Sequence, residues 1–90
     1  MPLITITEDD IRRGQRRSCR HCPAALAASR AYGLPVLVRP GDLTVYTQDG
    51  QHVLLCYSLP VALAIWVRTF DHKGEVRPAR FEFPDLPAVA

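Results

Sequence analysis

The stretch PVLVRPGDLTVYTQDGQHVLLCY, residues 35–57, decides the fold class of this 90-residue chain. It holds three runs rich in aliphatic and β-branched residues, and the turn-forming segments Pro40-Gly41-Asp42 and Asp49-Gly50 separate them. An Asp-Gly pair between two such runs favours a hairpin, because the tight hairpin turns need positive φ angles. We therefore expect a three-stranded antiparallel meander, whose strands cover residues 35–39, 43–47 and 52–57.

The N-terminal residues 3–14 predict a strand followed by a short helix. LITIT at 3–7 alternates aliphatic and hydroxyl side chains, as a half-buried strand does. Thr7 stands before three carboxylates, which suits an N-cap followed by an acidic first turn. Gly14 then suits the left-handed residue that closes many helices.

Residues 22–33 predict a second helix, with clear signals at both ends. Pro23 fits the first turn, because the amide it lacks would have no helical partner there. The alanine-rich run that follows ends at Tyr32, and Gly33 stands where a left-handed C-terminal cap belongs. The small side chains would let this helix approach a sheet or another helix closely.

The C-terminal third predicts a long apolar helix and one more strand. We expect Ser58 to be the N-cap of the helix, Pro60 to lie in its first turn and Asp71 to lie near its end. Residues 80–83 alternate around two phenylalanines and predict the last strand. The chain should therefore be one α+β domain, residues 1–90: a small antiparallel sheet, made of the three-stranded meander and the terminal strands, packed by two or three helices.

Composition restricts the class of protein. Hydrophobic residues make up 48% of the chain and charged residues 22%, which is typical of a globular domain. The N-terminus lacks the basic start and long apolar run of a secretory signal, and no stretch is long enough to cross a bilayer. Three cysteines do not make a disulfide framework. We therefore expect a cytoplasmic protein that does not bind a membrane.

The segment RRGQRRSCRH, residues 12–21, contains five arginines and no acid. Guanidinium groups pair bidentately with phosphate oxygens, so the segment predicts a site for nucleic acid or a small anion. The alternative is a solvated loop whose arginines pair with nearby carboxylates. The candidate residues are Arg12, Arg13, Arg16, Arg17 and Arg20.

Cys19 and Cys22 form a C-x-x-C at the start of the second helix. The helix dipole and the arginines would lower the pKa of a thiol there, as in a redox enzyme, but such a motif normally follows a buried strand. Structural zinc wants four ligands, and Cys56, His21, His52 and His72 would have to complete the set. We favour packing or helix capping by Cys22 over both, and we expect no metal and no cofactor.

Catalytic signatures are missing from the sequence. It has no glycine-rich phosphate loop, no G-x-S-x-G and no H-E-x-x-H. We therefore expect that the protein is not an enzyme.

The helix expected from Pro60 to Asp71 is apolar on nearly all sides, which is unusual in so small a domain. Either the rest of the chain covers it, or part of it contacts a host protein or a second copy in a homodimer. Trp and Phe are frequent interface anchors. The candidate interface residues are Leu63, Trp66, Val67 and Phe70.

Four stretches resemble small uncharacterised accessory proteins of bacteriophages that infect actinobacteria. They are ITITEDDIRRG at 4–14, CPAALA at 22–27, LPVALAIWVRTFD at 59–71 and VRPARFEF at 76–83. The resemblance implies a phage accessory protein made in the host cytoplasm, and it implies no activity and no catalytic residue. Cys19 and the dense arginines beside it are not part of the shared pattern.

These observations predict a non-enzymatic binding protein that acts on a host protein or sequesters a small anionic ligand. The alternative is a nucleic-acid-binding regulator that uses the basic segment from Arg12 to Arg20.

Overall fold

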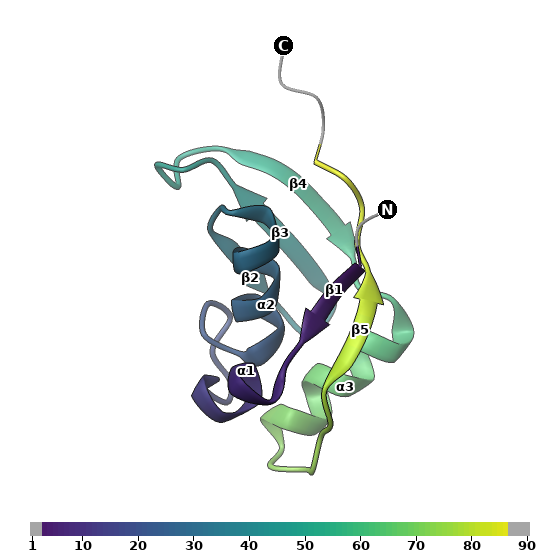
Figure 1. Ribbon diagram of the computed structural model, residues 1–90. Helices are drawn as coiled ribbons and strands as arrows, with labels where there is room; N and C mark the ends of the chain where they lie inside the picture. The colour runs from purple at the N-terminus through teal and green to yellow at the C-terminus, as the bar shows by residue number, and fades with distance from the viewer. Residues whose placement is uncertain (1–2, 87–90) are drawn as a thin grey trace.

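Residues 3–86 of the protein, described in a computed structural model, form three helices and two antiparallel sheets (Figure 1). The larger sheet is the meander β2-β3-β4, and the smaller one pairs β1 with β5. The predicted α+β class and the three-stranded meander are confirmed. The elements are β1 (Leu3–Ile6), α1 (Glu8–Arg13), α2 (Pro23–Tyr32), β2 (Val36–Val38), β3 (Asp42–Tyr46), β4 (Val53–Ser58), α3 (Val61–Asp71) and β5 (Ala79–Glu82).

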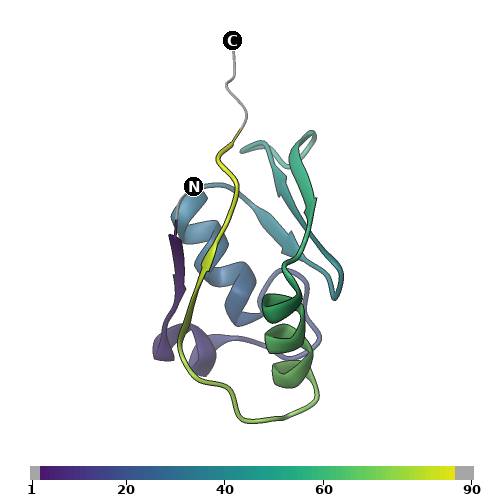
Figure 2. The same ribbon diagram turned by 90° about the vertical axis from the view of Figure 1, so that its right-hand side faces the viewer.

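The terminal strands β1 and β5 pair with each other rather than with the meander. Leu3 lies opposite Glu82 and Ile6 lies opposite Ala79. The alternation of the sequence sends Ile4, Ile6 and Phe83 inward, where all three are buried. Figure 2 shows this two-stranded ribbon separate from the meander, with β5 passing in front of α2.

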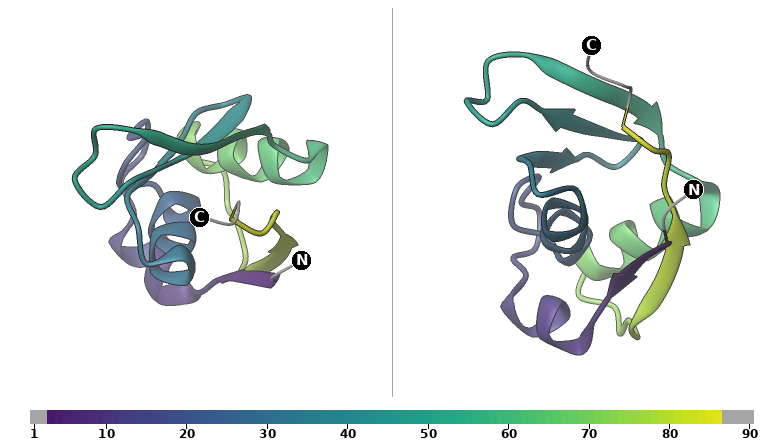
Figure 3. Two further views of the ribbon diagram at one scale, coloured as in Figure 1. Left: turned by 90° about the horizontal axis from the view of Figure 1, so that it is seen from above. Right: turned by 45° about the horizontal axis from the view of Figure 1, so that its top comes forward.

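The alanine face of α2 allows the helix to pack between the two sheets. α2 contacts β1 on one side and β2 on the other, as the view from above in Figure 3 also shows. Cys22 is its N-cap, and Gly33 ends it in the left-handed conformation with φ of 68°. Four alanines of this helix are buried: Ala24, Ala25, Ala27 and Ala28.

One core joins the elements. Leu43 and Val45 of β3, Leu63 and Val67 of α3 and the buried alanines of α2 belong to the same hydrophobic cluster. At about 25 cal/mol per Å² of apolar surface, burial of such side chains is the main favourable term for folding. Among residues 3–86, no helix has the length and apolar character needed to cross a bilayer.

Gly14 ends α1, but the predicted left-handed cap is wrong. Its φ of −69° and ψ of 149° are extended, and its N–H donates to the carbonyl of Asp10. A Cβ built on Gly14 would lie 2.5 Å from Cδ of Pro23. Glycine is therefore needed here for the close approach of the Pro23 ring, which opens α2.

α3 begins later than predicted. Ser58 is the last residue of β4, where it lies opposite Asp42, so it cannot cap the helix. Pro60 takes the N-cap position without a side-chain hydrogen bond. The sheet extends through Ser58 because its partner strand continues to Asp42.

The β3–β4 connection confirms the hairpin but not its tight primed turn. Strand pairing stops at Tyr46 and Val53, so the loop covers residues 47–52. Gly50 has φ of 73°, and the carboxylate of Asp49 accepts the N–H of Gln51 at 3.0 Å. The side chain of Asp49 therefore stabilises a wider loop than the dipeptide alone predicts.

Candidate anion-binding site

The predicted arginines fall into separate groups, and the first of these shares one carboxylate. Arg12 and Arg13 on α1 both pair with the carboxylate of Asp9, and Arg13 does so at 3.2 Å. The hydrogen bonds from these arginines hold the pKa of Asp9 below its usual value. These two residues therefore follow the alternative expectation, in which arginines pair with nearby acids.

Arg16 is held on an aromatic ring. Its guanidinium carbon lies 5.2 Å from the centre of the Phe70 ring, within the range of a cation–π contact. Phe70 in turn stacks on Trp66, with ring centres 6.1 Å apart and planes 10° apart. The contact fixes Arg16 beside the C-terminal end of α3.

Arg17 is held through its backbone. Its N–H donates to Oδ1 of Asp71 at 2.9 Å, and its φ of 59° is in the left-handed region. Two further backbone bonds order the same loop: Val38 donates to the carbonyl of Cys19 at 2.8 Å, and Gln15 donates to the carbonyl of His21 at 2.7 Å. The segment predicted as a loop is therefore a fixed structure on the end of α3.

Lys73 completes a cationic group that the sequence did not reveal. It follows the end of α3 with φ of 64°, so both left-handed residues other than glycine in 3–86 are cations of this region. A cavity of about 320 Å³ lies between the loop and the helix end. We call it the basic cavity, and its lining residues are Arg16, Arg17, Asp71, His72 and Lys73.

The cations of the basic cavity have no acidic partner. Among residues 3–86, no carboxylate lies within ion-pair distance of the side chains of Arg16, Arg17 or Lys73. Asp71 lines the cavity but accepts the backbone N–H of Arg17. The cavity therefore carries a net positive charge.

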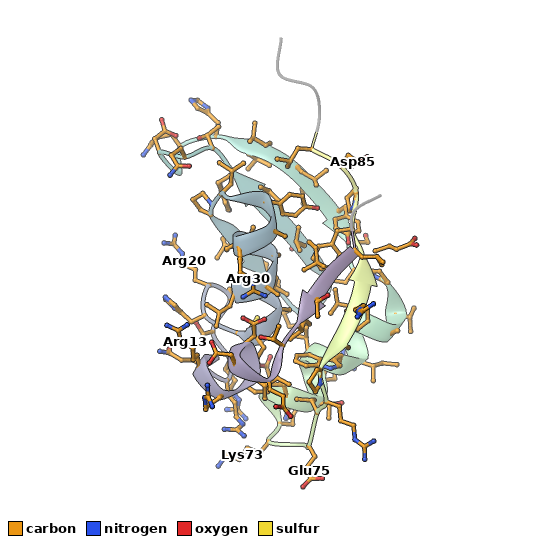
Figure 4. All side chains as sticks on the ribbon, in the orientation of Figure 1. Arg13, Arg20, Arg30, Lys73, Glu75 and Asp85 are labelled. Atoms are coloured by element: carbon orange, nitrogen blue, oxygen red, sulfur yellow. The ribbon has the colours of Figure 1, made fainter. Side chains whose placement is uncertain are left out.

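Arg20 lies apart from this group. It lines a different cavity of about 560 Å³, which Asp49 also lines. Figure 4 shows Arg20 on the α2 side of the molecule and Lys73 at the lower end. The five predicted arginines therefore do not form one surface: Arg16 and Arg17 line the basic cavity, and the others do not.

Lys73 and His72 were not predicted from the sequence as residues of this site, because they lie more than fifty positions from Arg16 in the chain. A local run of charge in the sequence indicates the basic loop, but it does not indicate that the end of α3 lies beside the loop. The only signal was the basic residue next to the predicted end of the apolar helix, where cations also complement the helix dipole.

The cysteine pair has the properties of a structural element at the start of α2. Cys22 is buried, and its Sγ accepts the N–H of Ala25 at 3.4 Å. Burial raises the pKa of the Cys22 thiol to about 11, because desolvation outweighs the hydrogen bonds from the backbone of Ala25 and Ala24, so the predicted lowering is wrong for Cys22. Cys19 is exposed, and the part of the chain that the structure describes holds no group of three possible metal ligands.

α3 directs most of its predicted interface residues into the protein's own core. Leu63, Val67 and Phe70 are buried, so they are not available for contact with a partner, and this part of the interface prediction is wrong. Trp66 is half-buried and donates its Nε1–H to the carbonyl of Arg77 at 3.0 Å. The exposed apolar residues of the helix are instead Val61 and Ile65.

The side chains of the basic cavity are suited to holding oxygen anions. Guanidinium and ammonium groups donate charge-assisted hydrogen bonds, which are about twice as strong as neutral ones.

Comparison of the chain with protein families, with curated proteins and with solved structures gave no match.

Proposed function

We propose that the protein is a non-enzymatic binding protein that holds a small anionic ligand in the basic cavity. One observation carries the proposal. Arg16, Arg17 and Lys73 line a single cavity and lack an acidic partner within residues 3–86. Arg20, Arg39, Arg68, Arg77 and Arg80 also lack an ion pair within the described residues, so this group is distinguished by the gathering of three cations in one cavity.

Backbone strain supports the proposal. A left-handed conformation in a residue other than glycine costs on the order of 1 kcal/mol, and such residues gather at binding sites. Both such residues described here, Arg17 and Lys73, line the basic cavity. At Lys73 the left-handed conformation closes α3, because Lys73 donates its N–H to the carbonyl of Phe70 and Gly74 donates to that of Thr69. The strain that supports the proposal is therefore that of Arg17.

Pre-organisation supports it as well. Arg16 is held by Phe70, and the backbone of Arg17 is held by Asp71. Binding to the Arg16 side chain therefore costs less conformational entropy, since immobilising a free long side chain costs about 0.5–1.5 kcal/mol, and the fixed backbone of Arg17 limits where its side chain can reach. The site should therefore bind an anion without a change of fold.

The geometry favours a small ligand over nucleic acid. Duplex DNA needs cations spread along a backbone of regularly spaced phosphates. Here Arg12 and Arg13 share the carboxylate of Asp9, and Arg20 lines another cavity. In a phage accessory protein, which the sequence resembles, the site would withdraw its ligand from the host cytoplasm.

Calorimetric titration with pyrophosphate at low salt tests the proposal. We expect saturable binding, and about tenfold weaker binding in Arg16→Gln and in Arg17→Gln, because a hydrogen bond to a charged group contributes about 1.5–3 kcal/mol. Arg80→Gln is the matched control. Arg80 is an exposed arginine on β5 outside the cavity. Arg80→Gln has the same net charge as Arg16→Gln and Arg17→Gln, but it should bind pyrophosphate like the wild type.

An equal loss of affinity in Arg80→Gln would mean that only net charge matters, and the proposal would be wrong. Absence of saturable binding would also contradict it. Tight binding of mixed-sequence DNA that falls steeply with salt, and that requires Arg12 and Arg20 as well, would instead support the nucleic-acid alternative.

A further inference from the structure

We propose that the ligand is an organic phosphate monoester of nucleotide size, with its phosphate in the basic cavity and its organic group in the cavity next to it. This inference rests on the proposed function, since the same cations bind the phosphate. It adds the second cavity and the chemical class of ligand that the two cavities together fit.

The second cavity has a volume of about 590 Å³ and shares Arg16 and Lys73 with the basic cavity. We call it the adjoining cavity. Arg16 and Lys73 stand at the boundary of the two cavities, so a phosphate bound to them lies next to both. Small-molecule sites are commonly about 300–1,000 Å³, so the adjoining cavity alone has room for an organic group.

The adjoining cavity differs chemically from the basic one. Ile11 and Val76, which are half-buried, line it with apolar surface. Contact between such surface and a compact organic group removes both from water, at about 25 cal/mol per Å². An inorganic anion in the basic cavity would leave this apolar surface exposed to water.

Glu75 determines which end of the ligand should lie in which cavity. It is exposed, lines the adjoining cavity and is absent from the basic one. Figure 4 shows Glu75 and Lys73 at the same end of the molecule. A carboxylate repels a phosphate and accepts hydrogen bonds from amino or hydroxyl groups. The phosphate should therefore lie on the Arg17 side, and a donor-bearing group such as a sugar or an aminated base should lie near Glu75.

The experiment compares adenosine 5′-monophosphate, inorganic phosphate and adenosine by calorimetric titration of the full chain. We expect the monophosphate to bind at least about tenfold more tightly than either of its parts, since it uses both cavities. Val76→Ser should reduce this preference and leave the affinity for inorganic phosphate unchanged. Glu75→Gln removes a repelling charge, so it should raise the affinity for inorganic phosphate and thereby reduce the preference. Val53→Ser is the control, because Val53 is an exposed valine on β4 outside both cavities.

The outcomes separate the two proposals. Equal affinity for the monophosphate and inorganic phosphate would overturn the inference and leave an anion-binding protein. A preference that survives both Glu75→Gln and Val76→Ser would also overturn it. No binding of any phosphate would overturn the inference and the proposed function together. Glu75 is exposed, so Glu75→Gln remains informative even if Val76→Ser is poorly folded.

Discussion

The backbone N–H of Arg17 donates to the carboxylate of Asp71 at 2.9 Å, which joins residues 54 positions apart. The bond fixes the basic loop on the last residue of α3. It also helps to hold Arg17 at a φ of 59°, a conformation that side chains with a Cβ disfavour. The loop and the helix end therefore form one rigid wall of the basic cavity.

Arg17→Gly and Arg17→Ala should differ in stability but not in anion binding. Both remove the guanidinium, so both should bind pyrophosphate about tenfold more weakly than the wild type. Only glycine adopts the left-handed conformation without strain. We therefore expect Arg17→Gly to be more stable than Arg17→Ala by about 1 kcal/mol in urea denaturation.

Arg16 supplies the control for this pair. It is not among the residues of positive φ, so glycine there should be less stable than alanine. If alanine were the more stable replacement at position 17 as well, the left-handed conformation of Arg17 in solution would be contradicted.

Local signals in the sequence predicted much of the fold. Thr7 and Cys22 cap their helices as expected, and Gly33 ends α2 in the left-handed conformation. These features depend on residues a few positions apart, which a sequence displays directly. Gly14 shows the limit: its role depends on contact with Pro23, and local pattern suggested a different role.

Long-range contacts explain why the candidate site was predicted only in part. The basic segment is visible as a run of charge, but pairing with Asp9 removes two of its members and Lys73 joins from the far end of α3. Long-range contacts also decide which residues of the apolar helix are buried. Phe70 is covered by Arg16 and Trp66, so it is buried within the chain, and no periodicity could show that.

Asp10→Asn should destabilise the protein in a pH-dependent way. Burial raises the pKa of Asp10, but hydrogen bonds from Arg30, at 2.7 Å and 2.9 Å, and from Thr7 outweigh it, so the pKa lies below its ordinary 3.8. A lowered pKa stabilises the fold above the unfolded value, and the effect is lost as pH falls below it. We expect a loss of about 2 kcal/mol at pH 7, because the charged hydrogen bonds to Arg30 lose their anionic acceptor, whereas the asparagine oxygen can still accept the N–H of Thr7.

The difference between Asp10→Asn and the wild type should shrink as the pH falls below 3.8. Urea denaturation at pH 7, 4 and 3 measures it. Asp9→Asn is the control, since Asp9 is exposed and its ion pairs lie on the surface, where such pairs contribute little. An Asp10→Asn deficit that stays constant with pH would contradict the ionic role.

Tyr57→Phe and Tyr32→Phe each remove a phenolic hydroxyl, and they should have opposite effects on the stability of the fold. The buried hydroxyl of Tyr57 has no hydrogen-bond partner within residues 3–86, and burial raises its pKa to about 12. Phenylalanine keeps the ring on Phe83 and removes an unsatisfied group, so we expect a gain of about 1 kcal/mol. Tyr32 donates its hydroxyl to the carbonyl of Pro84 at 2.6 Å, so Tyr32→Phe should lose about 1 kcal/mol.

Thermal and urea unfolding of the two tyrosine variants at pH 7 provide the measurement. A loss of stability in Tyr57→Phe comparable with that in Tyr32→Phe would show that the Tyr57 hydroxyl has a partner in solution.

Cys22 should make the protein less stable at alkaline pH. Burial raises its pKa from an ordinary 9.0 to about 11, so the folded protein keeps the thiol protonated while the unfolded chain ionises. For an acid whose pKa is raised by folding, stability is lost as pH rises above the unfolded value. The loss should therefore begin near pH 9 and be complete above pH 11, at about 2–3 kcal/mol.

Cys22→Ser isolates this effect, because the serine hydroxyl accepts at the same N-cap position and does not ionise in this range. Urea denaturation of both proteins from pH 7 to pH 11, with reducing agent present, should show wild type losing stability relative to the variant only above pH 9. Parallel curves across the whole range would mean that Cys22 ionises as easily in the folded protein as in the unfolded chain. In that case the thiol would be accessible to water, and helix capping by a buried Cys22 could not explain the cysteine pair.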